Sequence, residues 1–521
     1  MEPVVTVRQG RLKGCVQKST VGTKYLAFFG IPYATPPVGD LRFKDPKPPE
    51  RWQGIKDCMR RGVNVCPQRL EFPPYEIIGS ENCLFLNVYT NSLSSKKPVM
   101  FWIHGGSFIG GAGSFATWGP DYFMPKNVVV VSPNYRVGAL GFLNLGLKDA
   151  AGNMGLKDLI QALKWVKANA ATFGGDPNNI TVFGFSAGAV LGHAMAISPL
   201  SQGLFHKLIL QSGGITVPWG HDNDRKSFKL ASILGLDTTN PVKILEYMKK
   251  LSIADIVKAQ DSILSCPEAG MYQVCFGLTN DTASENPTFP LPIEQLIPND
   301  SKIPIIVGHV SHEFIMLLKE KTKQSFDSFN KYLPHYLEAI GSLRNLGPEE
   351  MKQLTEAVKK RYFKELPADQ DQLQEVLEFG TDAYFVLPLR VYVEDRLKRT
   401  STPTYFYNFS YYGNQKTHTD FILKRYTDGP THSDDLAYLF NLQSCKRKDE
   451  PAPARGTTDR AVMECYTTMW ANFAKTGNPT PVLNDVVTVA WEPATEEKFN
   501  CLEINAQCKL VELQPHILDS I

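Results

Sequence analysis

The sequence predicts an α/β fold in which helices flank a mostly parallel sheet. Apolar runs recur in the first half of the chain, each ending in a glycine-rich or polar turn, at residues 99–103, 128–131, 180–183 and 208–210. Near-continuous apolar runs of this kind are typical of strands that are buried on both faces of a parallel sheet. Between the second and third runs, residues 156–171 carry apolar side chains at helical spacing. A helix between two such strands predicts a parallel crossover.

The other elements follow from the same patterns. Residues 4–16 alternate around Gln9-Gly10-Arg11, which predicts a small N-terminal hairpin. Two later strands are expected at residues 303–307 and 405–409, with a helical insertion at about 318–400 and a further helix at 459–475. We find no low-complexity linker, charge run or internal repeat, so the prediction is one large domain over residues 1–521.

Composition and charge argue against several classes of function. Lys plus Arg is 55 against 53 for Asp plus Glu, a net charge of +2, so the basic excess of a nucleic-acid binder is missing. No apolar run is long enough to span a membrane. The chain has no Cys-x-x-Cys and no His/Cys cluster at zinc spacing, so neither a metal nor a cofactor is expected.

The strongest chemical motif spans residues 184–188, where Ser186 stands in Gly-Phe-Ser-Ala-Gly directly after a predicted strand. A nucleophilic serine needs a sharp strand-to-helix turn to present its hydroxyl, and the two glycines allow the backbone to turn that tightly. A second glycine-rich turn, His104-Gly105-Gly106-Ser107, follows another strand. Such a turn can direct backbone N–H groups at a developing oxyanion.

Candidates for the base and the acid that would activate this serine lie further along the chain. Glu313 follows the predicted strand at 303–307, and His432 lies in a polar turn. The order Ser186, Glu313, His432 is the one expected for an α/β-hydrolase. The chain has ten histidines, and spacing alone does not choose among them.

A set of segments in order over residues 9–513 carries a resemblance to a known family. These segments are 29–34 (Phe-Gly-Ile-Pro-Tyr-Ala), 36–39, 41–43, 79–84, 134–138, 155–158, 173–177, Gly308 with Glu313, and His432 with Asp434, Asp435, Leu436, Tyr438, Leu439 and Phe440. The chain resembles the type-B carboxylesterase and cholinesterase family, and most closely its insect α-esterase branch. The resemblance implies an α/β-hydrolase fold and a serine esterase without a cofactor.

The resemblance also implies roles for individual residues. It makes Ser186 the nucleophile, His432 the general base and then acid, and Glu313 the residue that orients the imidazole. The implied oxyanion-hole donors are the backbone N–H groups of Gly106, Ser107 and Ala187. Small to medium apolar esters, including xenobiotics, are the implied substrates, with covalent capture by organophosphate and carbamate inhibitors, as in detoxification and insecticide resistance.

Two positions depart from the family pattern. Phe185 stands where the family usually has Glu, and Ser107 stands where it usually has a third glycine. Both departures bear on substrate preference and turnover rather than on reaction class, and slow turnover would fit sequestration of organophosphates. Phe185 is therefore a candidate for the substrate pocket. Trp219 matches a position that lines the family's acyl pocket, with core packing as the alternative.

The chain also matches two cysteines of the family. Cys66 and Cys83 match a family disulfide, although a reducing cytosol would keep them as thiols; Cys266 and Cys275 match no family bridge that we can place. The loop between Cys66 and Cys83 lacks the tryptophan with which cholinesterases bind choline. Phe72 and Tyr75 could supply an aromatic face there, but core packing is the favoured role.

Two charge pairs, Arg42 with Glu81 and Arg136 with Asp158, match buried ion pairs of the family. For these a structural role is expected, because breaking such a pair leaves a charge uncompensated.

Two alternatives to a broad esterase stay open. One is an esterase dedicated to a single hormone or pheromone. The other is a non-catalytic adhesion protein of the same family, but such relatives usually lack a triad residue and all three are present here.

The N-terminus lacks a signal-peptide pattern, so a cytoplasmic monomer or weak oligomer is expected, or a secreted protein if a signal was removed. Sequons at Asn179, Asn280 and Asn408 are weak evidence for secretion.

Overall fold

A large mixed sheet forms the centre of the computed structural model, which describes residues 2–62, 65–70, 74–221, 225–264, 275–314, 322–363, 366–417, 419–422, 429–447 and 450–521. Within these residues the sheet has eleven strands. From one edge to the other they are β3 (Cys15–Lys18), β4 (Lys24–Pro32), β8 (Phe85–Thr90), β10 (Val129–Pro133), β9 (Lys97–Ile103), β13 (Gly175–Phe185), β14 (Lys207–Gln211), β15 (Ile305–Val310), β16 (Thr404–Phe409), β17 (Asn500–Ile504) and β18 (Lys509–Glu512). The strands from β10 to β17 pair in parallel and the edges pair antiparallel, which confirms the expected mostly parallel central sheet.

Smaller strands lie outside this sheet. The described residues contain a three-stranded sheet of β1 (Val4–Val7), β2 (Gly10–Lys13) and β5 (Ile55–Asp57), and the short pairs β6 (Gln68–Arg69) with β7 (Ile77–Ile78) and β11 (Asn144–Leu147) with β12 (Ala150–Ala151). The predicted N-terminal hairpin is therefore β1–β2. It ends at Lys13, because the next residues leave it and join the edge of the large sheet as β3.

Helices of 4 to 20 residues connect and cover these strands in the described chain. They are α1 (Gly138–Phe142), α2 (Met154–Asn169), α3 (Ala187–Ile197), α4 (Arg225–Ile233), α5 (Pro241–Lys250), α6 (Ile253–Leu264), α7 (Ile293–Leu296), α8 (Lys323–Ser342), α9 (Pro348–Tyr362), α10 (Leu373–Thr381), α11 (Leu387–Leu397), α12 (Thr419–Ile422) and α13 (Thr458–Thr476). The helices predicted at 156–171 and 459–475 are α2 and α13. None of the described helices is both long and apolar enough to cross a membrane.

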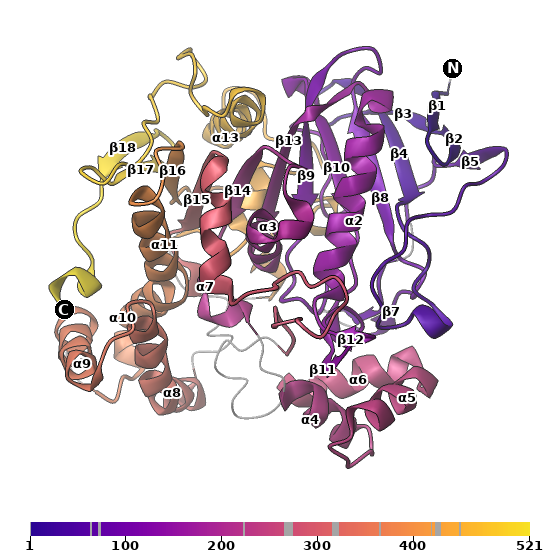
Figure 1. Cartoon of the computed structure of the whole chain (residues 1–521). Coiled ribbons are helices and arrows are strands. Elements are labelled where there is room, and N and C mark those ends of the chain that lie inside the picture. The colour runs from indigo at the N-terminus through magenta and orange to yellow at the C-terminus, as the bar shows by residue number, and fades with distance from the viewer. Residues whose placement is uncertain are drawn as a thin grey trace.

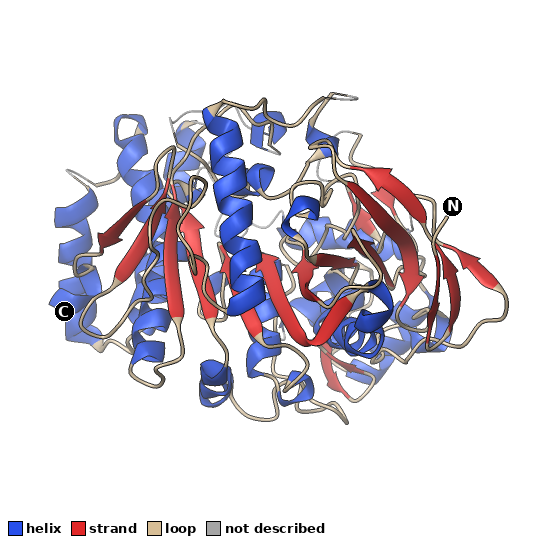
Figure 2. Cartoon of the chain, turned by 90° about the horizontal axis from the view of Figure 1, so that it is seen from above, coloured by secondary structure: helices blue, strands red, loops and turns tan. Residues whose placement is uncertain are grey.

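The two faces of the sheet pack into two separate cores. Along β9, Phe101 and Ile103 face one core, together with residues of α2, α3 and α11, whereas Met100 and Trp102 face the other, together with residues of α13. Alternating side chains of a strand point to opposite faces, so a strand that is covered on both sides is apolar at every position. Figure 1 shows α2 and α3 in front of the sheet, and Figure 2, turned by 90°, shows helices on both sides of it.

The predicted helical insertion corresponds to α8–α11, which gather at one end of the molecule in Figure 1. A second helical group, α4–α6, was not predicted and lies at the other lower corner of the same view. Its helices are amphipathic and short. A residue distant in sequence contacts the end of α5: Arg42 donates to the carbonyls of Met248, Lys249 and Leu251. These long-range bonds satisfy carbonyls that the helix itself leaves open.

Candidate active site

Ser186 stands on a strained turn between β13 and α3. Its backbone has φ 56° and ψ −127°, a conformation that costs roughly 1–3 kcal/mol and persists only where the surroundings impose it. A Cβ at Gly184 would lie 2.3 Å from the carbonyl oxygen of Gly188, and a Cβ at Gly188 would lie 2.2 Å from that of Ile103. Glycine is therefore required at both positions for steric reasons.

The structure brings the three predicted catalytic residues together. The Nε2 atom of His432 lies 2.9 Å from Oγ of Ser186, and its Nδ1 atom lies 2.5 Å from Oε2 of Glu313. All three side chains are buried. Glu313 is held by the N–H of Val310, which donates to Oε1 at 3.0 Å. Since an ionised carboxylate only accepts hydrogen bonds, Nδ1 is the donor to Glu313 and Nε2 is free to accept the serine proton.

Backbone contacts place the His432 turn beside the Glu313 turn. The N–H of His312 donates to the carbonyl of Pro430 at 3.2 Å, and His312 forms a parallel bridge with Thr431. The turn closes on itself, because the N–H of Thr431 donates to Asp434 Oδ2 and the N–H of Asp434 donates to the Thr431 carbonyl. Tertiary contacts of this kind select His432 among the histidines, which spacing alone could not do.

Aromatic rings flank the imidazole. The ring of Phe185 lies 4.5 Å from that of His432, and the ring of Phe385 lies 5.2 Å from it. Trp219 packs on Phe385 at 5.7 Å and donates from its indole to the Tyr384 carbonyl. Phe185 and Trp219 therefore both belong to an apolar wall around His432, and Trp219 is also buried in the core. Phe385 was not predicted, because it lies in a helical segment with no motif of its own.

A second buried carboxylate, Asp435, lies close to the triad. Its Oδ2 accepts hydrogen bonds from Tyr466 at 2.9 Å and from Gln211 at 3.0 Å. Burial raises the pKa of Asp435 to about 7; the Glu313 charge also raises it, while the hydrogen bonds and His432 oppose the rise. The sequence marked Asp435 only as part of a matching segment, and no local signal indicates its position beside Glu313.

The glycine-rich turn after β9 abuts the nucleophile. A Cβ on Gly105 would lie 2.9 Å from the Phe185 ring and 3.1 Å from Cβ of Ser186, so the backbone of this turn contacts the side chain of the serine residue. Gly106 has φ 117°, and a Cβ there would meet the Gly110 carbonyl oxygen at 2.3 Å. The turn therefore requires glycine at both positions.

The three predicted oxyanion-hole residues lie on either side of Ser186. Gly106 and Ser107 belong to the glycine-rich turn, and Ser107 keeps a positive φ of 52° although it is not glycine. Ala187 is the first residue of α3, so its N–H has no acceptor within the helix. A helix N-terminus of this kind favours negative charge, which suits a developing oxyanion.

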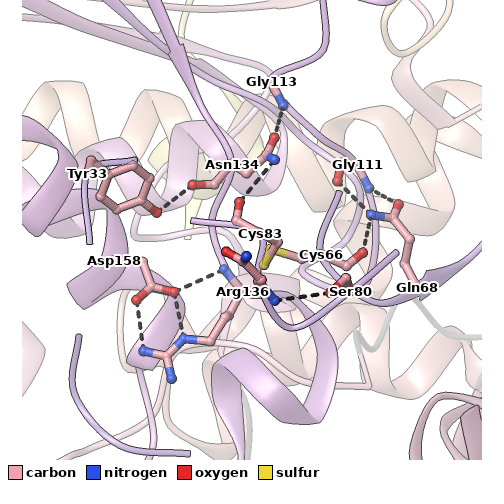
Figure 3. The surroundings of a disulfide bond; sticks show 11 residues. Tyr33, Cys66, Gln68, Ser80, Cys83, Gly111, Gly113, Asn134, Arg136 and Asp158 are labelled. Atoms are coloured by element: carbon pink, nitrogen blue, oxygen red, sulfur yellow. Dashed lines mark hydrogen bonds and ion pairs between the residues drawn. A yellow bond between two sulfur atoms is a disulfide. The ribbon is translucent and has the colours of Figure 1, made fainter. Parts of the chain in front are cut away.

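The loop that the Cys66–Cys83 disulfide closes contacts the glycine-rich turn through Gln68 (Figure 3). Cys66 and Cys83 are joined in the structure. From the same loop, Gln68 accepts from the N–H of Gly111 at 2.7 Å and donates to the carbonyls of Gly111 and Cys66, both at 2.9 Å. Gly111 in turn packs against His104, at the start of the turn. Gln68 therefore ties the Cys66–Cys83 loop to the turn that carries Gly106 and Ser107.

The predicted ion pairs are present, Arg136–Asp158 buried and Arg42–Glu81 mostly so. Arg136 contacts both carboxylate oxygens of Asp158 at 2.8 Å, as Figure 3 shows, and joins the end of β10 to α2. Arg42 contacts both oxygens of Glu81 at 2.6 and 2.8 Å.

The expected core packing of Tyr75 is wrong. Its side chain is 51% exposed, and Arg69 lies over its ring, 5.6 Å from the centroid, where the guanidinium keeps one face covered at the surface. Phe72 and Cys266, which the sequence analysis also considered, lie outside the described residues.

A group of three side chains in the described residues comes close enough to share a metal ion: Glu394, His516 and Asp519. Arg344 already lies 2.7 Å from Glu394, and His516 lies 3.2 Å from the same carboxylate. The cluster is therefore an ion-pair network that fastens the C-terminal segment to α11.

Comparisons with known proteins give the family to which the chain belongs. A sequence model of the carboxylesterase family matches residues 1–517. Esterase E4 of Myzus persicae is 32% identical, with 95% of this chain and 89% of that protein covered, and juvenile hormone esterase of Tribolium castaneum is 32% identical, with 95% and 86% covered. The crystal structure of juvenile hormone esterase from Manduca sexta, with OTFP covalently attached, superposes with a TM-score of 0.83 at 27% identity, covering 100% of this chain and 99% of that one. The chain thus belongs to the carboxylesterase family, has the α/β-hydrolase fold and is a carboxylic ester hydrolase.

Proposed function

We propose that the protein is a serine carboxylesterase that hydrolyses its substrates through an acyl-enzyme on Ser186. The observation that carries the proposal is the hydrogen-bonded series Ser186 Oγ, His432 and Glu313, with distances of 2.9 and 2.5 Å. A serine hydroxyl is a weak nucleophile until an adjacent base takes its proton, and this arrangement supplies the base and its orienting carboxylate.

The steps follow from these contacts. Oγ of Ser186 bonds to the ester carbonyl carbon while its proton passes to Nε2 of His432. The carbonyl oxygen becomes an oxyanion, which the N–H groups of Gly106, Ser107 and Ala187 stabilise, each contributing about 3–4 kcal/mol. The C–O bond to the alcohol then breaks, and the alcohol takes the proton from His432. Water, deprotonated by His432, repeats the sequence on the acyl-enzyme and releases the acid.

The proposed substrates are small to medium apolar esters, including xenobiotics, with organophosphates and carbamates as covalent inhibitors. The aromatic wall of Phe185, Phe385 and Trp219 supports this class, because apolar rings beside the base favour apolar acyl groups. Phe185 also means that the residue directly before the nucleophile is not acidic, which supports slow release of a phosphorylated or acylated serine and hence sequestration of organophosphates.

The test replaces the nucleophile. Ser186→Ala should lower kcat for a nitrophenyl or naphthyl ester by at least about 10³-fold while the melting temperature stays unchanged. Ser94→Ala, at an exposed serine, is the matched control and should keep full activity. A fluorophosphonate probe should add its mass to the peptide containing residue 186 in the wild type and in Ser94→Ala only. Unchanged turnover in folded Ser186→Ala would refute the assignment.

A dedicated hormone esterase is the alternative, and the likeness to juvenile hormone esterases is the observation that favours it. A panel of esters varied separately in acyl and alcohol length separates the two. A broad detoxification enzyme should accept most members within about tenfold in kcat/KM, whereas a dedicated enzyme should favour one member by 10³-fold or more. Burst kinetics on the same panel distinguish turnover from sequestration.

A further inference from the structure

A pair of cysteines outside the catalytic triad lies in contact without being joined. Sγ of Cys465, in α13, lies 3.9 Å from Sγ of Cys508, in the turn between β17 and β18. Both residues are partly exposed. Figure 1 shows both elements in the upper part of the view, α13 in gold and β17–β18 in yellow, and the two cysteines are 43 residues apart in sequence.

We propose that Cys465 and Cys508 form a redox-responsive thiol pair, which a small-molecule disulfide such as oxidised glutathione converts into a second intrachain disulfide. A disulfide needs the sulfurs at about 2.05 Å, and these two already lie 3.9 Å apart. Oxidation would join α13 to the β17–β18 hairpin at the edge of the sheet.

The pKa values of the two thiols are shifted in opposite directions. The contact with Cys465 and a backbone hydrogen bond from Asn505 lower the pKa of Cys508, whereas the same contact and burial raise the pKa of Cys465. The thiolate is the attacking species in thiol–disulfide exchange, so Cys508 attacks first and Cys465 resolves. Among other thiols of the described chain, burial raises the pKa of Cys58 to about 12 and that of Cys445 to about 11, which makes them poor nucleophiles.

The chemistry balances in two steps. The Cys508 thiolate attacks one sulfur of oxidised glutathione, the glutathione S–S bond breaks, and one glutathione leaves as a thiolate. Cys465 then loses its proton and attacks the Cys508 sulfur, the mixed disulfide breaks, and the second glutathione leaves as a thiolate that takes up a proton. The protein loses two electrons and the oxidant gains them.

The position of the pair gives the bond a structural consequence. The β17–β18 hairpin is the outer edge of the sheet, and Cys465 is followed by Tyr466, which donates to Asp435 at 2.9 Å. Tyr466 also packs on Phe409 of β16 at 5.3 Å. A bond at residue 465 would therefore fasten the sheet edge to the helix that holds the segment after His432.

The experiment uses the full chain and oxidised glutathione. Purified protein is incubated with and without it, free thiols are alkylated, and peptides are mapped under non-reducing conditions. We expect a linked Cys465–Cys508 peptide in the wild type and in Cys15→Ser, a control at another partly exposed thiol, but not in Cys465→Ser or Cys508→Ser. Cys508→Ser should also lose the mixed disulfide with glutathione, whereas Cys465→Ser should retain it.

Stability gives a second readout. The linked wild type should melt about 2–6 °C above the untreated protein, and Cys465→Ser should not respond. The mapped wild type is informative even if a variant fails to fold. Alkylation of both thiols after treatment, glutathione retained on one of them in the wild type, or an unchanged melting temperature of the linked protein would each overturn the proposal.

Discussion

At the scale of single residues, Phe185 is the departure with the most direct consequence for chemistry. Its ring lies 4.5 Å from the imidazole of His432, at the position where the family resemblance leads us to expect a glutamate. An apolar ring beside the base supplies no hydrogen bond to water, so in the proposed mechanism Phe185 takes no part in proton transfer during hydrolysis of the acyl-enzyme.

Phe185→Glu should therefore change the ratio of kcat for acetyl and butyryl esters by about threefold or more. Phe185→Leu is the matched control, because it keeps the site apolar and alters only shape. Steady-state rates and burst amplitudes across an ester series give the comparison. Identical kinetics in Phe185→Glu and the wild type would mean that the position is neutral.

Burial of the Asp435 carboxylate makes the stability of the folded protein depend on pH. Its pKa in the folded protein is raised to about 7 from an ordinary value of 3.8, chiefly by burial. The folded state therefore binds a proton that the unfolded state has lost. This contribution to stability is present below pH 4 and is lost as the pH rises through 7.

Asp435→Asn removes that titration while keeping the shape of the side chain. Relative to the variant, the free energy of unfolding of the wild type should fall by up to about 1.4 kcal/mol per pH unit between pH 5 and 7. Urea denaturation at several pH values measures the difference. Parallel pH profiles for the two proteins would contradict the raised pKa.

At the scale of elements, the sharp turn between β13 and α3 depends on Gly188, whose surroundings differ from those of Gly192 in the same helix. A Cβ on Gly188 would lie 2.2 Å from the Ile103 carbonyl oxygen of β9, whereas a Cβ on Gly192 would lie no closer than 3.4 Å to any neighbour. The first contact is with backbone, which cannot rotate away.

Gly188→Ala should thus destabilise the protein by about 3 kcal/mol and lower kcat by about 100-fold, because the helix must shift and carry Ser186 with it. Gly192→Ala, in the same helix, should keep activity and stability. Thermal denaturation and ester hydrolysis of the two variants provide the test. Equal tolerance of both substitutions would argue against a steric requirement at residue 188.

At the scale of the whole molecule, buried charges join segments that are distant in sequence. Arg136 pairs with Asp158 and also donates to the Lys44 carbonyl at 2.8 Å, so one guanidinium connects β10, α2 and the N-terminal region. Both side chains of the pair are buried, so removal of one leaves the charge of the other buried without its ion-pair partner.

Arg136→Ala should cost about 3–5 kcal/mol in the free energy of unfolding, as measured by denaturant titration. Arg60→Ala breaks a surface pair in which Arg60 is 91% exposed, and should cost at most about 0.5 kcal/mol. A similar loss in both variants would be incompatible with a special role for the buried pair.

Much of the architecture was predictable from sequence because it depends on local pattern. Strands covered on both faces must be apolar at every position, which marked β9, β13 and β14, and helical spacing marked α2 and α13. Other elements lacked such a signal. The short amphipathic helices α4–α6 and the edge strands β3 and β18 were not predicted, because their pairing depends on distant partners rather than on their own residues.

The sequence by itself determined the sharp turn at Ser186, since the glycines around it are a local steric requirement. It also determined the reaction class, through motifs that match the family. Only the tertiary structure brought His432 and Glu313 to that serine, placed Asp435 and Phe385 beside them, and put Cys465 against Cys508. These juxtapositions join positions tens to hundreds of residues apart, and the packing of the two cores on the central sheet creates them.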